Sequence, residues 1–161
     1  MSNAVRAESH KHFFMGAKLQ PRQGVYAGLF AGVGMMLLWL CGAQIWGPGA
    51  RMLLISIGGI LPAIESPSLQ MILGLLIHFL IAVGLGVLFA VSLDRLDNKD
   101  TLIVSTFYGF TIWVVSVIIL RHWLHVNAIQ MSRSWWGFLV FLFFGFLLGV
   151  YANLFGRTPV R

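Results

Sequence analysis

The chain alternates between long apolar runs and short polar connections. Four runs contain no Asp, Glu, Lys or Arg, and each has about the 20 residues that a helix needs to cross roughly 30 Å of hydrocarbon. They are Val25–Trp46, Leu69–Leu93, Leu102–Leu120 and Trp135–Phe155. Strands of a membrane barrel would alternate in polarity, whereas these runs are continuously apolar. The pattern predicts an all-α integral membrane protein with four transmembrane helices.

The connections between the runs carry signals for helix ends. Gly47-Pro48-Gly49 should end the first helix, and Ser66-Pro67 suits the start of the second. Asp100 is expected to cap the third helix, and Ser132 or Ser134 the fourth. The three predicted regions are a basic N-terminal tail (1–24), the four-helix bundle (25–155) and a short C-terminal tail (156–161).

A shorter apolar segment, Met52–Leu61, separates the first two spans and cannot itself cross the membrane. Two interpretations stay open: a short interfacial helix over the bundle, or a re-entrant segment that lines a pathway. The sequence shows no repeat of 20 to 50 residues.

Composition supports the membrane assignment. Hydrophobic residues make up 58% of the chain and charged residues 10%, whereas soluble domains are about 45–50% apolar and about 25% charged. The single cysteine, Cys41, lies inside an apolar run. A disulfide framework and a cysteine zinc site are therefore excluded.

The distribution of Lys and Arg predicts that both termini are cytoplasmic. Eight of these residues lie in the N-terminal tail, the connection between the second and third spans, and the C-terminal tail, against three on the other side. The net charge of +6 then indicates topology and attraction to anionic lipid rather than nucleic-acid binding. The expected aromatic markers are Trp46, Trp123, Trp135 and Trp136 outside, and Tyr26 and Tyr151 inside.

Small residues recur at four-residue spacing along three of the spans. Such stripes let membrane helices approach closely. They predict faces for packing within the bundle, for docking another membrane subunit, or for both. The residues are Gly24, Gly28, Gly32, Gly74, Ala82, Gly86, Gly145 and Gly149.

His78 is the candidate functional polar residue inside a span, because it lies near mid-membrane in the second run. A structural histidine would bond to a hydroxyl of the third span, where Ser105, Thr106, Thr111 and Ser116 lie. A functional one would face a transport pathway. Both interpretations stay open.

The sequence offers little support for cofactor binding or catalysis by this chain. A haem on His78 would need a second axial ligand at equal depth, and His122 and His125 lie past the third span. Their i, i+3 spacing makes them a weak metal or interface candidate. No metal or catalytic residue is expected, and no cofactor is expected from this chain alone. A haem or quinone at a subunit interface remains the minority alternative.

The order of these features is similar to that of a known group. A Gly-x-x-x-Gly first helix runs into Met35-Met36, Gly58-Gly59 follows, and the last helix carries Phe144-Gly145-x-x-x-Gly149. This arrangement resembles the YagU-like uncharacterised four-helix inner-membrane proteins of bacteria, over most of residues 24–155. The resemblance implies a bacterial cytoplasmic membrane and four helices, and no catalytic residue.

The sequence therefore favours a non-catalytic accessory subunit of a larger bacterial membrane complex, energy-transducing in kind, respiratory or photosynthetic. Its expected partners are other membrane subunits and anionic lipid at the cytoplasmic face. Two alternatives stay open. One is a self-associating small transporter or channel with His78 facing the pathway, and the other is a haem- or quinone-binding redox subunit.

Overall fold

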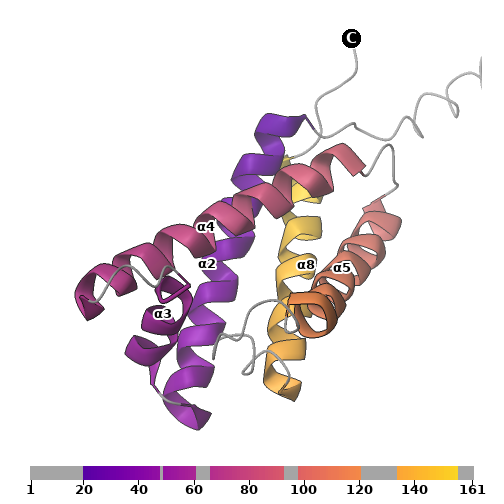
Figure 1. Ribbon diagram of the computed structural model, residues 1–161. Helices are drawn as coiled ribbons and strands as arrows, with labels where there is room; N and C mark the ends of the chain where they lie inside the picture. Colours follow the sequence, from indigo (N-terminus) through magenta and orange to yellow (C-terminus); the bar gives the residue numbers. More distant parts are fainter. Residues whose placement is uncertain (1–19, 48, 61–65, 93–97, 121–133, 156–161) are drawn as a thin grey trace, which may run out of the picture.

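The computed structural model describes residues 20–47, 49–60, 66–92, 98–120 and 134–155 (Figure 1). Regular structure in these ranges is entirely helical. The helices are α2 (Pro21–Trp46), α3 (Ala50–Gly58), α4 (Pro67–Ser92), α5 (Asn98–Val115), the π-helical turn η1 (Ser116–Leu120) and α8 (Trp135–Phe155).

Four helical segments are long and apolar enough to span a membrane: Pro21–Trp46, Pro67–Ser92, Asp100–Ile118 and Trp135–Phe155. The predicted all-α fold with four spans is confirmed. The chain is thus a multi-pass membrane protein.

Local chemistry explains where the helices begin. α2 starts at Pro21, before the predicted Val25, and the backbone N–H of Gln20 donates to Gln23 Oε1 at 2.8 Å. Proline suits this first position because its missing N–H would be unpaired there. α8 starts at Trp135 as predicted, and Ser134 Oγ accepts from the N–H of Gly137 at 3.1 Å.

The predicted cap of the third span is wrong. α5 begins at Asn98, so Asp100 lies inside the first turn and does not precede it. An acidic side chain in the first turn is still favourable, because the helix dipole places partial positive charge there.

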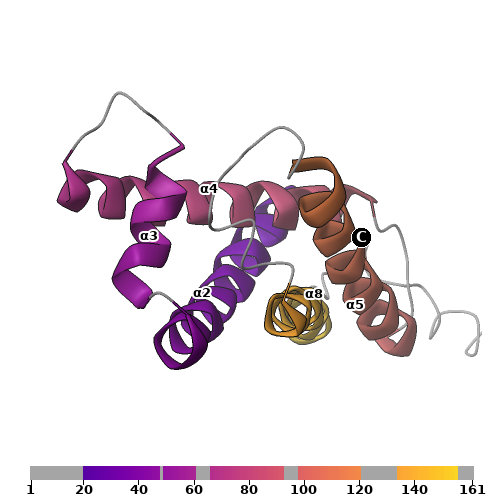
Figure 2. The ribbon, with the colours of Figure 1, turned by 60° about the horizontal axis from the view of Figure 1, so that its bottom comes forward.

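α2 is the central helix of the bundle. It packs against α4 on one side and α8 on another, and α5 packs against α8 (Figures 1 and 2). α3 packs against α4 and also touches α2. In Figure 1, α4 crosses α2 obliquely, so that its first turns lie far from α5 and α8.

The segment between the first two spans forms the short helix α3. A Cβ on Gly58 would meet the backbone of Gln70, and one on Gly74 would meet the carbonyl oxygen of Leu54. α3 therefore runs antiparallel to the first turns of α4, packed backbone to backbone. Leu61, the predicted last residue of this segment, lies outside the described residues.

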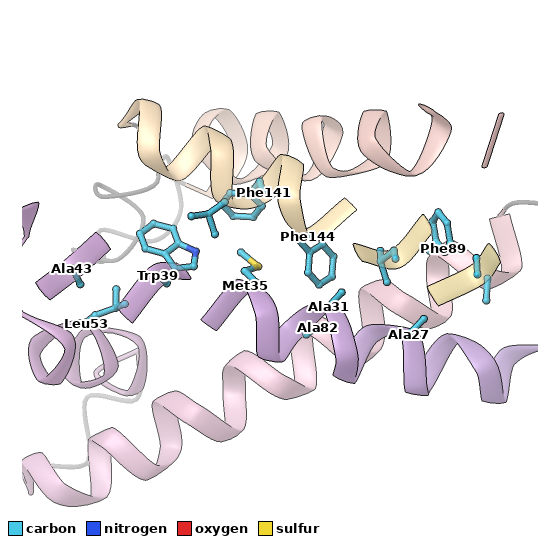
Figure 3. Packing of buried hydrophobic residues seen from close by; sticks show 14 residues of the cluster. Ala27, Ala31, Met35, Trp39, Ala43, Leu53, Ala82, Phe89, Phe141 and Phe144 are labelled. Atoms are coloured by element: carbon cyan, nitrogen blue, oxygen red, sulfur yellow. The ribbon is translucent and has the colours of Figure 1, made fainter. Parts of the chain in front are cut away.

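The core lies between α2, α4 and α8. Small side chains of α2, such as Ala27 and Ala31, leave room for Phe144 and Leu148 of α8, which are fully buried (Figure 3). Lipid is as apolar as these side chains, so the gain here is close van der Waals packing rather than removal from water.

The start of α2 and the end of α8 lie at the same end of the bundle, where Gln23 Nε2 donates to the carbonyl oxygen of Phe155 at 3.3 Å. We call this the Gln23 end. At the opposite end, the Trp46 end, the rings of Trp46, Trp135 and Trp136 lie 5.0–6.0 Å apart. Trp123, the fourth expected marker there, lies outside the described residues.

Candidate functional site

The predicted small residues of the first two spans form a tight interface between α2 and α4. A Cβ on Gly24 would lie 2.7 Å from the carbonyl oxygen of Gly86, and a Cβ on Gly32 would lie 2.8 Å from Ala82 Cβ. Gly28 faces the backbone of Ala82 and Val83. Larger residues at these positions would force the two helices apart, so the spacing predicted from sequence sets their contact.

The remaining predicted small residues lie at two other contacts. Gly74 faces the backbone of α3, while Gly145 and Gly149 face Ser105 of α5. All eight residues therefore touch other helices of the same chain. A partner subunit could therefore contact these faces only if the chain's own helices first moved apart.

The sequence analysis assigned no packing role to three further small residues, Gly109, Ser105 and Gly42. Gly109 of α5 faces the backbone of Phe141 and Gly145 of α8, beside Ser105. Gly42 lies under the ring of Trp136, whose Nε1 donates to the carbonyl oxygen of Leu38 at 3.3 Å. The motif Ser105-x-x-x-Gly109, two small residues at four-residue spacing, could have identified Ser105 and Gly109 from the sequence. Gly42 carries no such pattern.

His78 lies in the interface between α2 and α4. Its Nε2 is 3.0 Å from the carbonyl oxygen of Gly32, and its ring meets that of Phe79 edge-on at 5.3 Å. Because a carbonyl can only accept, Nε2 carries the proton and donates it. The absence of a side chain at Gly32 lets the imidazole reach the backbone of α2.

The hydrogen bond of His78 goes to the backbone of α2 and not to one of the hydroxyls expected on the third span. Ser105 Oγ and Thr106 Oγ1 donate to the carbonyl oxygen of Leu102, and Thr111 Oγ1 donates to that of Phe107. These hydroxyls satisfy their own helix, as Ser and Thr often do in apolar surroundings. His78 instead ties the second span to the first.

This hydrogen bond limits what His78 can bind. Its Nε2 is occupied, so a haem iron or another metal could reach the ring through Nδ1 alone. Within the described parts of the chain, no group of three or more His, Cys, Asp and Glu side chains could hold a metal ion. His122 and His125 lie outside these parts, so their weak candidacy stays a prediction.

The contact between α4 and α5, which we call the α4–α5 seam, is thin. Tyr108 Oη donates to the carbonyl oxygen of Leu85 at 2.9 Å, and its ring lies 5.5 Å from that of Phe89. Nearer the Trp46 end the same two faces are uncovered: Ile81, one turn before Leu85, is 56% exposed, and Val115, two turns after Tyr108, is 40% exposed. Tyr108 therefore makes a polar contact across this seam.

A shallow groove of about 380 Å³ runs along α8, between Leu38 of α2 and Thr106 of α5. Its lining is almost wholly apolar, and the Thr106 hydroxyl is already bonded to Leu102. Such a surface suits a lipid acyl chain rather than a polar substrate.

Comparison with protein-family models, curated proteins and solved structures finds no match to this chain.

Proposed function

We propose that this protein is a non-catalytic accessory subunit of a larger membrane complex, held in place by contacts between transmembrane helices. The complex we propose is a bacterial one in the cytoplasmic membrane, energy-transducing in kind, respiratory or photosynthetic. Its partners are other membrane subunits and anionic lipid, and it does not bind nucleic acid.

The observation that carries the proposal is the uneven coverage of the four spans. α2 is covered on several sides, whereas α4 keeps an uncovered face that includes Leu80, Gly84 and Val91. A Cβ on Gly84 would meet nothing within 4 Å. A glycine on an uncovered face leaves the backbone open to close approach by another helix.

The contacts of His78 favour this function over a transporter. Transporters built on helix bundles place polar or charged groups around a site at mid-membrane. His78 is instead committed to the backbone of a neighbouring helix, and its ring packs on Phe79. The same hydrogen bond supports haem ligation poorly, so we place any haem or quinone on a partner subunit.

Extraction from the native membrane in mild detergent tests the proposal. The protein is run on a native gel, comigrating chains are identified by mass spectrometry, and the visible spectrum of the band is recorded. Comigration with large redox or photosynthetic subunits is the expected result. A small colourless band of this chain alone would overturn the proposal.

Two matched variants sharpen the experiment. Gly84→Leu adds bulk to the uncovered face of α4, where the chain itself has space, and should release the protein from its partners. Cys41→Leu places the same leucine side chain at an exposed position of α2 and should leave comigration intact. Both variants should keep the stability of the parent in isolation.

A further inference from the structure

The interface between α2 and α4 and the interface between α5 and α8 are built from equivalent contacts. A Cβ on Gly86 would lie 2.6 Å from Gly28 Cα, and a Cβ on Gly145 would lie 2.9 Å from Gly109 Cα. Gly86 of α4 and Gly145 of α8 thus occupy the same place in their respective pairs, opposite Gly28 and Gly109.

Two further contacts repeat in the same register. Gly86 faces the carbonyl oxygen of Gly24, and Gly145 faces that of Ser105, four residues before the facing glycine in each case. Gly28 faces the carbonyl oxygen of Ala82, and Gly109 faces that of Phe141, four residues before the facing glycine of the other helix. The two interfaces therefore agree over a full helical turn on both helices of each pair.

The register also aligns the sequences of α4 and α8. With Gly86 placed on Gly145, five positions between 79 and 91 carry the same residue in both helices. The pairs are Phe79 and Phe138, Leu80 and Leu139, Gly86 and Gly145, Leu88 and Leu147, and Val91 and Val150. The alignment of α2 with α5 and that of α4 with α8 need different sequence offsets. The reason is that the connection containing α3 places more residues between the glycines of α2 and α4 than lie between those of α5 and α8.

Equivalence of the pairs makes the two seams between them equivalent as well. The α2–α8 seam is closed by hydrogen bonds near both ends, Gln23 to Phe155 and Trp136 to Leu38. The α4–α5 seam has the Tyr108 contact and then opens towards the Trp46 end (Figures 1 and 2).

One contact shows the difference directly. A Cβ on Gly34 of α2 would meet Leu147 of α8. The equivalent positions across the other seam are Val115 and Leu88, which are 40% and 53% exposed. Val115 carries a branched side chain where α2 has none, so α4 cannot approach α5 as closely as α8 approaches α2.

We propose that the chain consists of two equivalent helix-pair units, α2/α4 and α5/α8, which rock about the α2–α8 seam so that the α4–α5 seam opens and closes sideways to the membrane. Tyr108 is the latch of this seam. The proposal does not depend on the accessory function, because it concerns contacts within the chain.

Distances between spin labels test it on the full-length protein in lipid nanodiscs. The background is Cys41→Ser, since Cys41 is the single cysteine of the chain. Labels at Leu80 and Ile118 report across the α4–α5 seam. Two control pairs share these labels and stay within a unit: Leu80 with Val33 of α2, and Ile118 with Leu139 of α8.

The expected distribution across the seam is broad with two components, and the two control distributions are narrow. Tyr108→Phe removes the latch hydroxyl and keeps the ring. It should raise the ratio of the long to the short component about three- to fivefold, the effect of one net hydrogen bond, without changing the controls.

Three results would overturn the proposal. One is a distribution across the seam as narrow as the controls, and another is a broad one that Tyr108→Phe leaves unchanged. The third is equal broadening of all three pairs, because the units would then not be rigid bodies.

Discussion

The two helix pairs of this protein solve the same packing problem with different residues. In α2/α4, Gly24 faces Ala90, whereas in α5/α8 the equivalent residues are Ser105 and Gly149. The larger residue sits on one helix in the first pair and on the other helix in the second. The backbone separation is preserved because the summed side-chain volume at the contact, not the identity of either residue, sets it.

A second exchange occurs about two turns further along α2. Gly32 faces the α4 helix near His78, and the equivalent register positions in the other pair are Trp113 and Gly137. The first pair thus gains a hydrogen bond from His78 to the backbone of α2. The second pair gains an aromatic contact, with the rings of Trp113 and Phe138 5.1 Å apart. The bulky group lies on α4 in the first pair and on α5, the equivalent of α2, in the second, so each interface holds one bulky group here and the partner position is a glycine.

The largest expected effect comes from filling the shared glycine of either pair. Gly86→Leu and Gly145→Leu should each lower the free energy of unfolding by about 3 kcal/mol or more, because the added side chain meets backbone that cannot move away. SDS-induced unfolding in mixed micelles, followed by tryptophan fluorescence, measures this. Gly84→Leu is the control and should change stability by less than about 0.5 kcal/mol. A large loss for one glycine and none for the other would break the equivalence of the pairs.

A swap between the pairs has a smaller effect and a sharper outcome. Gly24→Ser should cost about 1–2 kcal/mol, because its Cβ would lie 2.8 Å from Ala90 Cβ and 2.7 Å from the carbonyl oxygen of Gly86. Adding Ala90→Gly recreates the Ser105–Gly149 combination of the second pair and should restore at least half of the loss. The coupling energy from a double-mutant cycle is the measurement. Additive losses would mean that the two interfaces are only superficially alike.

The smallest effect is expected at His78. His78→Ala should cost about 1 kcal/mol, the usual worth of a hydrogen bond between membrane helices with some lost packing. His78→Phe keeps the ring and isolates the hydrogen bond. Thr111→Val serves as control, because its hydroxyl bonds within its own exposed helix turn. If His78→Ala unfolds the protein, or if it removes ion flux from proteoliposomes, then His78 does more than form one hydrogen bond between helices.

The sequence determined the number of spans, because continuous apolar runs of membrane length leave the backbone no alternative to helix. It also predicted the start of α8 at Trp135, with Ser132 or Ser134 as its cap, and the small residues of α2 and α4, since both depend on neighbours along the chain. It did not determine Asp100 as a cap, because several polar residues precede the third span and any of them can begin a helix.

The tertiary structure alone decided which small residues face each other and which group His78 binds. It also decided that the two helix pairs have the same contact geometry. These facts depend on register between helices far apart in the chain, and small-residue spacing fits several registers equally well. His78 illustrates the reason: hydroxyls on the third span and a bare carbonyl on the first were both chemically suitable acceptors. The packing of α4 on α2 at Ala82 and Gly86 brought the carbonyl oxygen of Gly32 within reach of His78.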